Sequence, residues 1–317
     1  MVRPIRRRST MHAASIPASD RSALVRWGFP ALFVVLWASA FTAAKVAVTY
    51  APPFLLLSTR FLLAGLVLAG LARLSGRRWT LGPGAVARFA LLGIVTMAVY
   101  LALSYFGMQS VTSGFAALII SMNPVLTVVL AAPLLGEKLT RAKLAGLALG
   151  VVGVGIVLQS RLGGGIEGPV GIAFTFGALV ALSASTILYK RIAPPSNGPS
   201  GDLWYGTAVQ TLAAGIVLLP LGLALEPVSA IRWTPELLAG FLWLALAVSL
   251  CSYLLWFDML DRLGASTASA LHFLVPPIGL LLGWAVLGEH VPPLDLLGVV
   301  PIALGIRLVT RPAPARR

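Results

Sequence analysis

The chain has 317 residues, of which 58% are hydrophobic and only 11% are charged, and its mean hydropathy is +0.92. A water-soluble globular protein of this length needs far more polar surface, so the composition places the chain in a lipid bilayer. The net charge of +14 does not indicate nucleic acid binding, because the basic residues stand in short clusters between apolar segments and not on one solvated face.

A helix needs about 20 mostly apolar residues to cross the hydrocarbon core of a membrane. Ten stretches come close to this length, and the chain is therefore predicted to be an all-α integral membrane protein with ten transmembrane helices. In chain order they are residues 28–50, 54–72, 89–108, 114–135, 144–159, 170–189, 203–223, 237–257, 266–287 and 294–309. The fifth and tenth are the shortest, which indicates thin or tilted packing.

A basic segment, residues 1–26, precedes the first span. The apolar stretch after it is too long for a cleaved signal peptide, so we predict an uncleaved first span behind a cytoplasmic tail. Met11 is an alternative start to Met1. The single cysteine, Cys251, excludes an intramolecular disulfide and a cysteine-ligated metal cluster.

Positive charge in short loops marks the cytoplasmic side of a membrane protein. With the amino terminus placed inside, 20 of the 24 lysines and arginines fall on the cytoplasmic side, and two of the others, Lys45 and Arg60, lie within spans. We therefore predict that both termini are cytoplasmic. Residues 161–169 are then an external linker, and residues 311–317 are a cytoplasmic tail.

The sequence contains one unit twice. Setting Pro124 against Pro276 aligns the Leu-Gly-Glu triplet at residues 135–137 with the same triplet at residues 287–289, and no gap is needed. In the same register, Gly146 aligns with Gly298 and Gly153 with Gly305. In slightly shifted registers, Ala64-Gly65 aligns with Ala214-Gly215 and Lys45 with Lys190. We predict two units of five helices each, residues 27–160 and residues 170–310.

An odd number of spans in each unit makes the second unit enter the membrane from the opposite face. The halves are therefore predicted to be inverted copies, which is the architecture of transporters that work by alternating access. Pro124 and Pro276 interrupt the fourth and ninth spans, and a membrane tolerates such a break only where protein or a wet cavity satisfies the freed backbone. We predict that both prolines are matched hinges of two gating helices.

A family resemblance rests on the Trp-Ala-Ser-Ala-Phe segment at residues 37–41, Lys45, the Arg60-Phe61 pair, Pro124, and the Leu-Gly-Glu triplet at residues 135–137. In these features the chain resembles EamA-type members of the drug/metabolite transporter superfamily. The resemblance covers nearly all of residues 28–309. It implies ten helices, a bacterial inner-membrane location, and movement, usually efflux, of amino acids or other small metabolites.

Aromatic walls with a few polar atoms suit a small organic solute, and core packing is the alternative for each side chain. A charge within a span usually faces a cavity or a partner. Arg60 lies deep enough to hold a substrate carboxylate with two parallel hydrogen bonds, whereas Lys45 is expected to extend toward the lipid headgroups. The predicted substrate-binding residues are Trp37, Arg60, Tyr100, Asn123, Tyr253 and His272.

The spans contain no carboxylate near their middle, so protons, if they are the coupling ion, are predicted to pass through His272. A buried histidine bonded to a carbonyl is the alternative. Asn123 is expected either to bond a carbonyl freed by the break at Pro124 or to contact substrate. Glu137 and Glu289 end their helices and are predicted to pair with nearby basic residues.

These features predict a secondary active transporter that exports amino acids or other small metabolites by alternating access, with no cofactor and no bound metal. Its expected partners are a small solute and the lipid bilayer, and the oligomeric state stays open. A passive channel or facilitator is the first alternative. An intramembrane enzyme is the second, and it would need a paired acid, a His-Glu metal motif or a Ser-His dyad within the spans, which the sequence does not offer.

Overall fold

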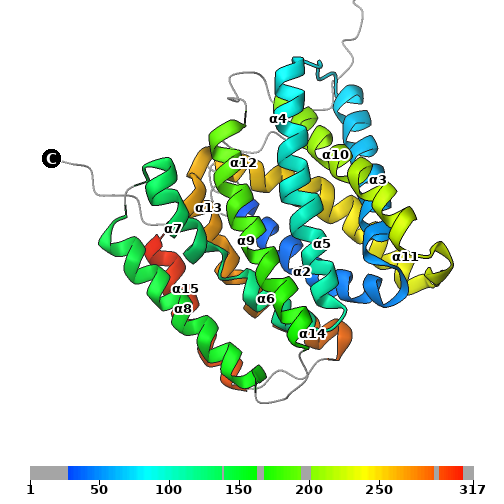
Figure 1. Cartoon of the computed structure of the whole chain (residues 1–317). Coiled ribbons are helices and arrows are strands. Elements are labelled where there is room, and N and C mark those ends of the chain that lie inside the picture. Colours follow the sequence, from blue (N-terminus) through cyan, green and yellow to red (C-terminus); the bar gives the residue numbers. More distant parts are fainter. Residues whose placement is uncertain (1–27, 138, 163–167, 194–200, 289–292, 310–317) are drawn as a thin grey trace, which may run out of the picture.

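The computed structural model describes residues 28–137, 139–162, 168–193, 201–288 and 293–309, and this part of the chain is helical throughout, with no strand (Figure 1). The predicted tails, most of the predicted linker, Glu289 and both candidate start residues lie outside the described residues. The helices of the first half are α2 (Phe29–Tyr50), α3 (Pro53–Leu74), α4 (Pro83–Gly93), η2 (Ile94–Val99), α5 (Tyr100–Met108), α6 (Ser113–Ile120), α7 (Asn123–Leu135) and α8 (Arg141–Leu162).

The second half repeats this order. It contains α9 (Pro169–Ile192), α10 (Gly201–Leu225), a short turn η3 (Val228–Ala230), α11 (Pro235–Leu242), η4 (Trp243–Ser252), α12 (Tyr253–Leu263), α13 (Ala265–Ala270), η5 (Leu271–Leu274), α14 (Val275–Leu287) and α15 (Pro293–Val309).

Eight helical stretches of the described part are long and apolar enough to cross a membrane, so the chain is a multi-pass membrane protein. They coincide with eight of the ten predicted spans. They are residues 29–50, 53–74, 83–108, 113–135, 169–192, 203–225, 235–263 and 265–287. The fifth and tenth predicted spans fall on the helices α8 and α15, of which α15 contributes only a shorter apolar stretch, Val300–Val309.

Two π-helical stretches interrupt the third and eighth spans at equivalent places. The helix α4 continues through η2 into α5, and α11 continues through η4 into α12. In both spans the regular α-helix resumes at a tyrosine, Tyr100 in the first half and Tyr253 in the second. A π-helical turn changes which way the following side chains point, and such turns are frequent at functional sites.

The fourth and ninth spans are each broken in two, as the repeated prolines predict. The break lies between α6 and α7 in one half and at the 3₁₀ turn η5 in the other. Pro124 and Pro276 do not sit inside a kinked continuous helix. Each is buried in the first turn after the break. In the first turn of a helix a backbone N–H group has no intrahelical acceptor, so the N–H that proline lacks is not missed there.

Two glycine-rich seams join the halves. In the first, a β-carbon built at Gly65 would lie 2.6 Å from Leu212 Cγ, and one at Gly215 would lie 2.8 Å from Leu62 Cγ, so α3 and α10 make the same contact in both directions. In the second, Gly153 faces the carbonyl oxygen of Gly298, and Gly146 faces that of Gly305. Figure 1 shows α8 and α15 side by side at the edge of the bundle. A two-repeat architecture fits these contacts.

Charged side chains satisfy backbone groups at several helix ends. Lys45, predicted to extend toward headgroups, instead donates to the carbonyl oxygens of Met108 at 2.7 Å and Val111 at 2.9 Å, because these carbonyls at the end of α5 lack helical partners. Lys190 donates to the carbonyl oxygen of Leu260 at 3.0 Å, near the end of α12. The two lysines that align in the repeat therefore have the same role.

Glu137 pairs locally, as predicted: one carboxylate oxygen lies 3.5 Å from Lys143 Nζ. The sequence did not predict that the same carboxylate also reaches the start of α13. There it accepts a hydrogen bond of 3.1 Å from the backbone N–H of Ala265 and another from the Ser266 hydroxyl. Glu137 thus links the end of α7 to the opposite half of the chain.

Candidate functional site

A small cavity of about 20 Å³ lies between α2, α3, α5 and the η4–α12 stretch. Helices from both halves of the chain build it. Its lining is Trp37, Ala40, Phe41, Ala44, Arg60, Tyr100, Leu101, Ser104, Tyr105, Met108, Val248 and Tyr253. The space is enough for about one water molecule. A metabolite therefore fits only after the surrounding helices separate.

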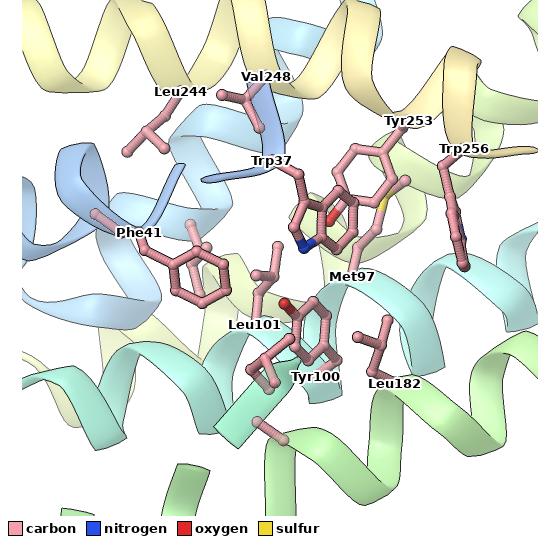
Figure 2. Packing of buried hydrophobic residues seen from close by; sticks show 14 of the residues in the cluster. Trp37, Phe41, Met97, Tyr100, Leu101, Leu182, Leu244, Val248, Tyr253 and Trp256 are labelled. Atoms are coloured by element: carbon pink, nitrogen blue, oxygen red, sulfur yellow. The ribbon is translucent and has the colours of Figure 1, made fainter. Parts of the chain in front are cut away.

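Trp37 of α2 is the centre of an aromatic cluster around this cavity. Its indole is stacked parallel to the ring of Tyr100, with 6.4 Å between ring centroids, and the ring of Tyr253 meets it edge-on at 5.7 Å. Figure 2 shows the indole between these two tyrosines, with Trp256 beyond Tyr253. Both tyrosines directly follow the π-helical stretches, which explains how two equivalent spans turn the same side chain toward one tryptophan.

Arg60 of α3 is the positive charge of the cavity, and only 2% of its surface is exposed. Its Nε donates to the hydroxyl of Ser249 at 2.9 Å, and its Nη1 donates to the hydroxyl of Tyr105 at 2.6 Å. These partners are neutral and lie on η4 and α5. The guanidinium therefore connects α3 to both neighbouring spans. Neither of these two hydrogen bonds involves a negatively charged acceptor.

His272 of η5 is fully buried behind Trp37 and does not line the cavity. Its Nδ1 lies 3.1 Å from the carbonyl oxygen of Ser269, and its Nε2 has no hydrogen-bond partner. The rings of Phe33, Trp37 and Trp256 surround the imidazole at centroid distances of 5.7, 5.1 and 5.0 Å. The predicted alternative, a buried histidine facing a carbonyl, describes this conformation.

Asn123 also lies away from the cavity. Its Oδ1 accepts hydrogen bonds from Thr127 at 3.0 Å and from Ser183 of α9 at 2.8 Å. The predicted bond to a carbonyl freed by Pro124 would be donated by the amide Nδ2, and this nitrogen has no hydrogen-bond partner among the described residues. Asn123 thus ties α7 to α9 just after the break in the fourth span.

The structure brings together four of the six predicted site residues, namely Trp37, Arg60, Tyr100 and Tyr253. Sequence reasoning missed Tyr105 and Ser249 as the partners of Arg60. Neither residue stands in a sequence pattern that marks it as the partner of an arginine. The available signal was the tyrosine itself, since a buried tyrosine hydroxyl needs a polar partner.

A larger cavity of about 740 Å³ lies on another side of α2, beside α11, η4 and α14. Lys45 and Glu236 are among its lining residues, together with Leu282 and Val286 of α14. This space is open to the surface beside α14, the second half of the broken ninth span, where Val286 is exposed. Among the residues that the structure describes, no three His, Cys, Asp or Glu side chains gather as they would around a metal ion.

Comparison with known proteins adds to this geometry. The family model described as "EamA-like transporter family" matches residues 28–159 and again residues 169–311. A "Probable terminal-alkyne amino-acid exporter" of Streptantibioticus cattleyicolor is 33% identical over 90% of this chain and 93% of the exporter. A "Probable amino-acid metabolite efflux pump" of Salmonella typhimurium is 29% identical over 88% of this chain and 93% of the pump.

The fold itself also has a relative among solved structures. A structure described only as "Crystal structure of protein" has a TM-score of 0.72 at 19% sequence identity. The match covers 90% of this chain and 96% of the other. At this identity the comparison shows a shared fold.

Proposed function

Because the chain belongs to the EamA-like transporter family, we propose that it is a secondary active transporter that exports amino acids or other small metabolites by alternating access. One observation carries the proposal. The small cavity around Trp37 and Arg60 is walled by helices of both sequence halves, so a movement of one half against the other would widen it. The two relatives above are named as an amino-acid exporter and an amino-acid metabolite efflux pump, which supports the solute class.

The test is a solute-transport screen on the purified protein in liposomes, with and without an imposed pH gradient. We expect at least one small metabolite to accumulate against its own gradient, and protein-free liposomes are the control. Equilibration without accumulation would indicate a channel or facilitator. Chemical conversion of the supplied solute would indicate an enzyme.

The proposal includes ten spans in two inverted units, in the bacterial inner membrane, with both termini in the cytoplasm. The supporting observation is the charge count, in which 20 of the 24 basic residues fall on one side. A cysteine placed at position 164 in a Cys251→Ala background is expected to react with a membrane-impermeant thiol reagent in intact cells. Labelling that requires permeabilised cells would contradict this orientation.

Protons are the proposed coupling ion, with His272 as their carrier. It is the single histidine in the described part of the chain, and its Nε2 is unpaired, so an opening of the aromatic cage would make this nitrogen a proton acceptor. A His272→Gln variant keeps a hydrogen-bonding group but cannot titrate. We expect it to lose uptake driven by a pH gradient while counterflow exchange continues.

The counterflow measurement is the internal control for folding of the His272→Gln variant. If uptake driven by the pH gradient stays at the wild-type level, His272 is a packing residue and the coupling lies elsewhere. If both activities are lost together, the imidazole is required for the closed aromatic packing and not for the proton step.

A further inference from the structure

The positive charge of Arg60 is buried, and no carboxylate of the described residues forms an ion pair with it. Two ion pairs lie elsewhere in the described residues, between Lys143 and Glu137 and between Arg262 and Asp258, and both involve side chains at helix ends. The bonds of Arg60 go to two neutral hydroxyls. A buried ion that is not paired is strongly destabilising, so this charge favours binding of an anion that the described part of the chain does not supply.

The cavity beside Arg60 offers further donors and no carboxylate. The indole Nε1 of Trp37 and the hydroxyl of Ser104 both line it, both are buried, and neither has a hydrogen-bond partner. An indole N–H can only donate, and so can a guanidinium, which carries more N–H groups than its two bonds use. A ligand that satisfies these groups must therefore bring hydrogen-bond acceptors.

The repeat provides an internal comparison for Arg60. The alignment of Ala64-Gly65 with Ala214-Gly215 sets Arg60 against Gln210. Gln210 is 1% exposed, and its Oε1 has no partner. The fold therefore accommodates an uncharged amide at the equivalent place of α10, and helix packing alone does not require the charge on α3.

We propose that Arg60 binds the carboxylate of the transported solute, an inference that rests on the proposed function and specifies its substrate class. The solute is a small carboxylate with an apolar or aromatic body, and amino acids belong to this class. The guanidinium holds the carboxylate through charge-assisted hydrogen bonds. Trp37 and Ser104 supply further hydrogen bonds, and the rings of Tyr100 and Tyr253 contact the body of the solute.

Binding can be measured without transport, by the rise in unfolding temperature of the purified protein with increasing ligand. The probes are leucine, phenylalanine and 4-methylpentanoate, each compared with its own primary amide. We expect at least one of the acids to stabilise the wild-type protein at a concentration at least tenfold below that of its amide. In Arg60→Gln, which installs the residue found in the other half, this preference is expected to disappear.

Two further variants separate binding from packing. Arg60→Lys keeps the charge but not the planar pair of donors, so we expect a weaker preference for the acid and not its complete loss. Ser249→Ala removes one hydrogen bond to the guanidinium and leaves its charge, so the preference should stay within about threefold of wild type. A purely structural Arg60 would change the unfolding temperature of the free protein without changing the ratio between acid and amide.

The inference is overturned if none of the acids stabilises the wild-type protein, or if Arg60→Gln keeps the acid preference. Transport of the same pairs into liposomes distinguishes this failure from that of the proposed function. Binding that depends on Arg60 without any transport counts against the transporter proposal alone. Transport that does not discriminate between acid and amide counts against the carboxylate site alone.

Discussion

Leucine in place of Gly153 is expected to lower the free energy of unfolding by about 2–3 kcal/mol. A β-carbon at Gly153 would lie 2.6 Å from both the carbonyl oxygen of Gly298 and Cγ1 of Ile302, so α8 and α15 would have to separate. Helices in a membrane gain little from burial of apolar surface against each other, and they depend on close packing of small residues. Loss of this contact therefore removes much of what holds α15 to α8.

The matched control is Gly155→Leu, on the same helix. Gly155 is exposed, and a β-carbon there would meet no atom within 4 Å. We expect its unfolding midpoint to stay close to that of wild type in a denaturant titration of the purified protein in detergent micelles. Equal midpoints for Gly153→Leu and Gly155→Leu would show that the glycine seam between α8 and α15 does not stabilise the fold.

The double variant Pro124→Ala, Pro276→Ala is expected to turn over at least tenfold more slowly than wild type in counterflow exchange. Alanine restores an N–H group at both positions and favours one continuous helix through the fourth span, whereas in the ninth span Pro277 remains and the effect there is smaller. The proposed motion needs the two parts of these spans to change their angle at the break.

Pro133→Ala is the control for this hinge prediction. Pro133 lies inside α7, about two turns beyond the break, and its side chain is exposed. Its replacement should leave turnover nearly unchanged. A double variant that inserts normally and turns over at the wild-type rate would mean that the helices do not bend at these prolines.

Much of the fold follows from the sequence, because the length of an apolar stretch and the thickness of a membrane fix the spans. The repeat of Pro124 at Pro276 likewise predicted two broken helices at equivalent places. The π-helical stretches were not predicted, since they depend on how the third and eighth spans pack and carry no residue signature of their own. They matter for the site, because Tyr100 and Tyr253 follow them directly.

The candidate site was predicted only in part, because the contacts of a side chain depend on how the spans pack. Position within a span separates deep residues such as Arg60 from those near an end, but it does not say which neighbours they meet. Lys45 shows the limit: its place along α2 is as predicted, yet its partners are the carbonyls at the end of α5. His272 likewise lies in the expected ninth span, but it packs against the ring of Trp37 and does not line the cavity.

The two glycine seams have the form of an isologous interface, in which residue i of one unit meets residue j of its equal and j meets i in return. Gly65 meets Leu212 while Gly215 meets Leu62, and Gly146 meets Gly305 while Gly153 meets Gly298. Two identical units held by such seams would form a homodimer in which every substitution appears twice. A homodimer would then carry a cation at both central positions or at neither. Joining the units in one chain removes this restriction, so Arg60 can carry a charge although the equivalent residue of the other half is the neutral Gln210.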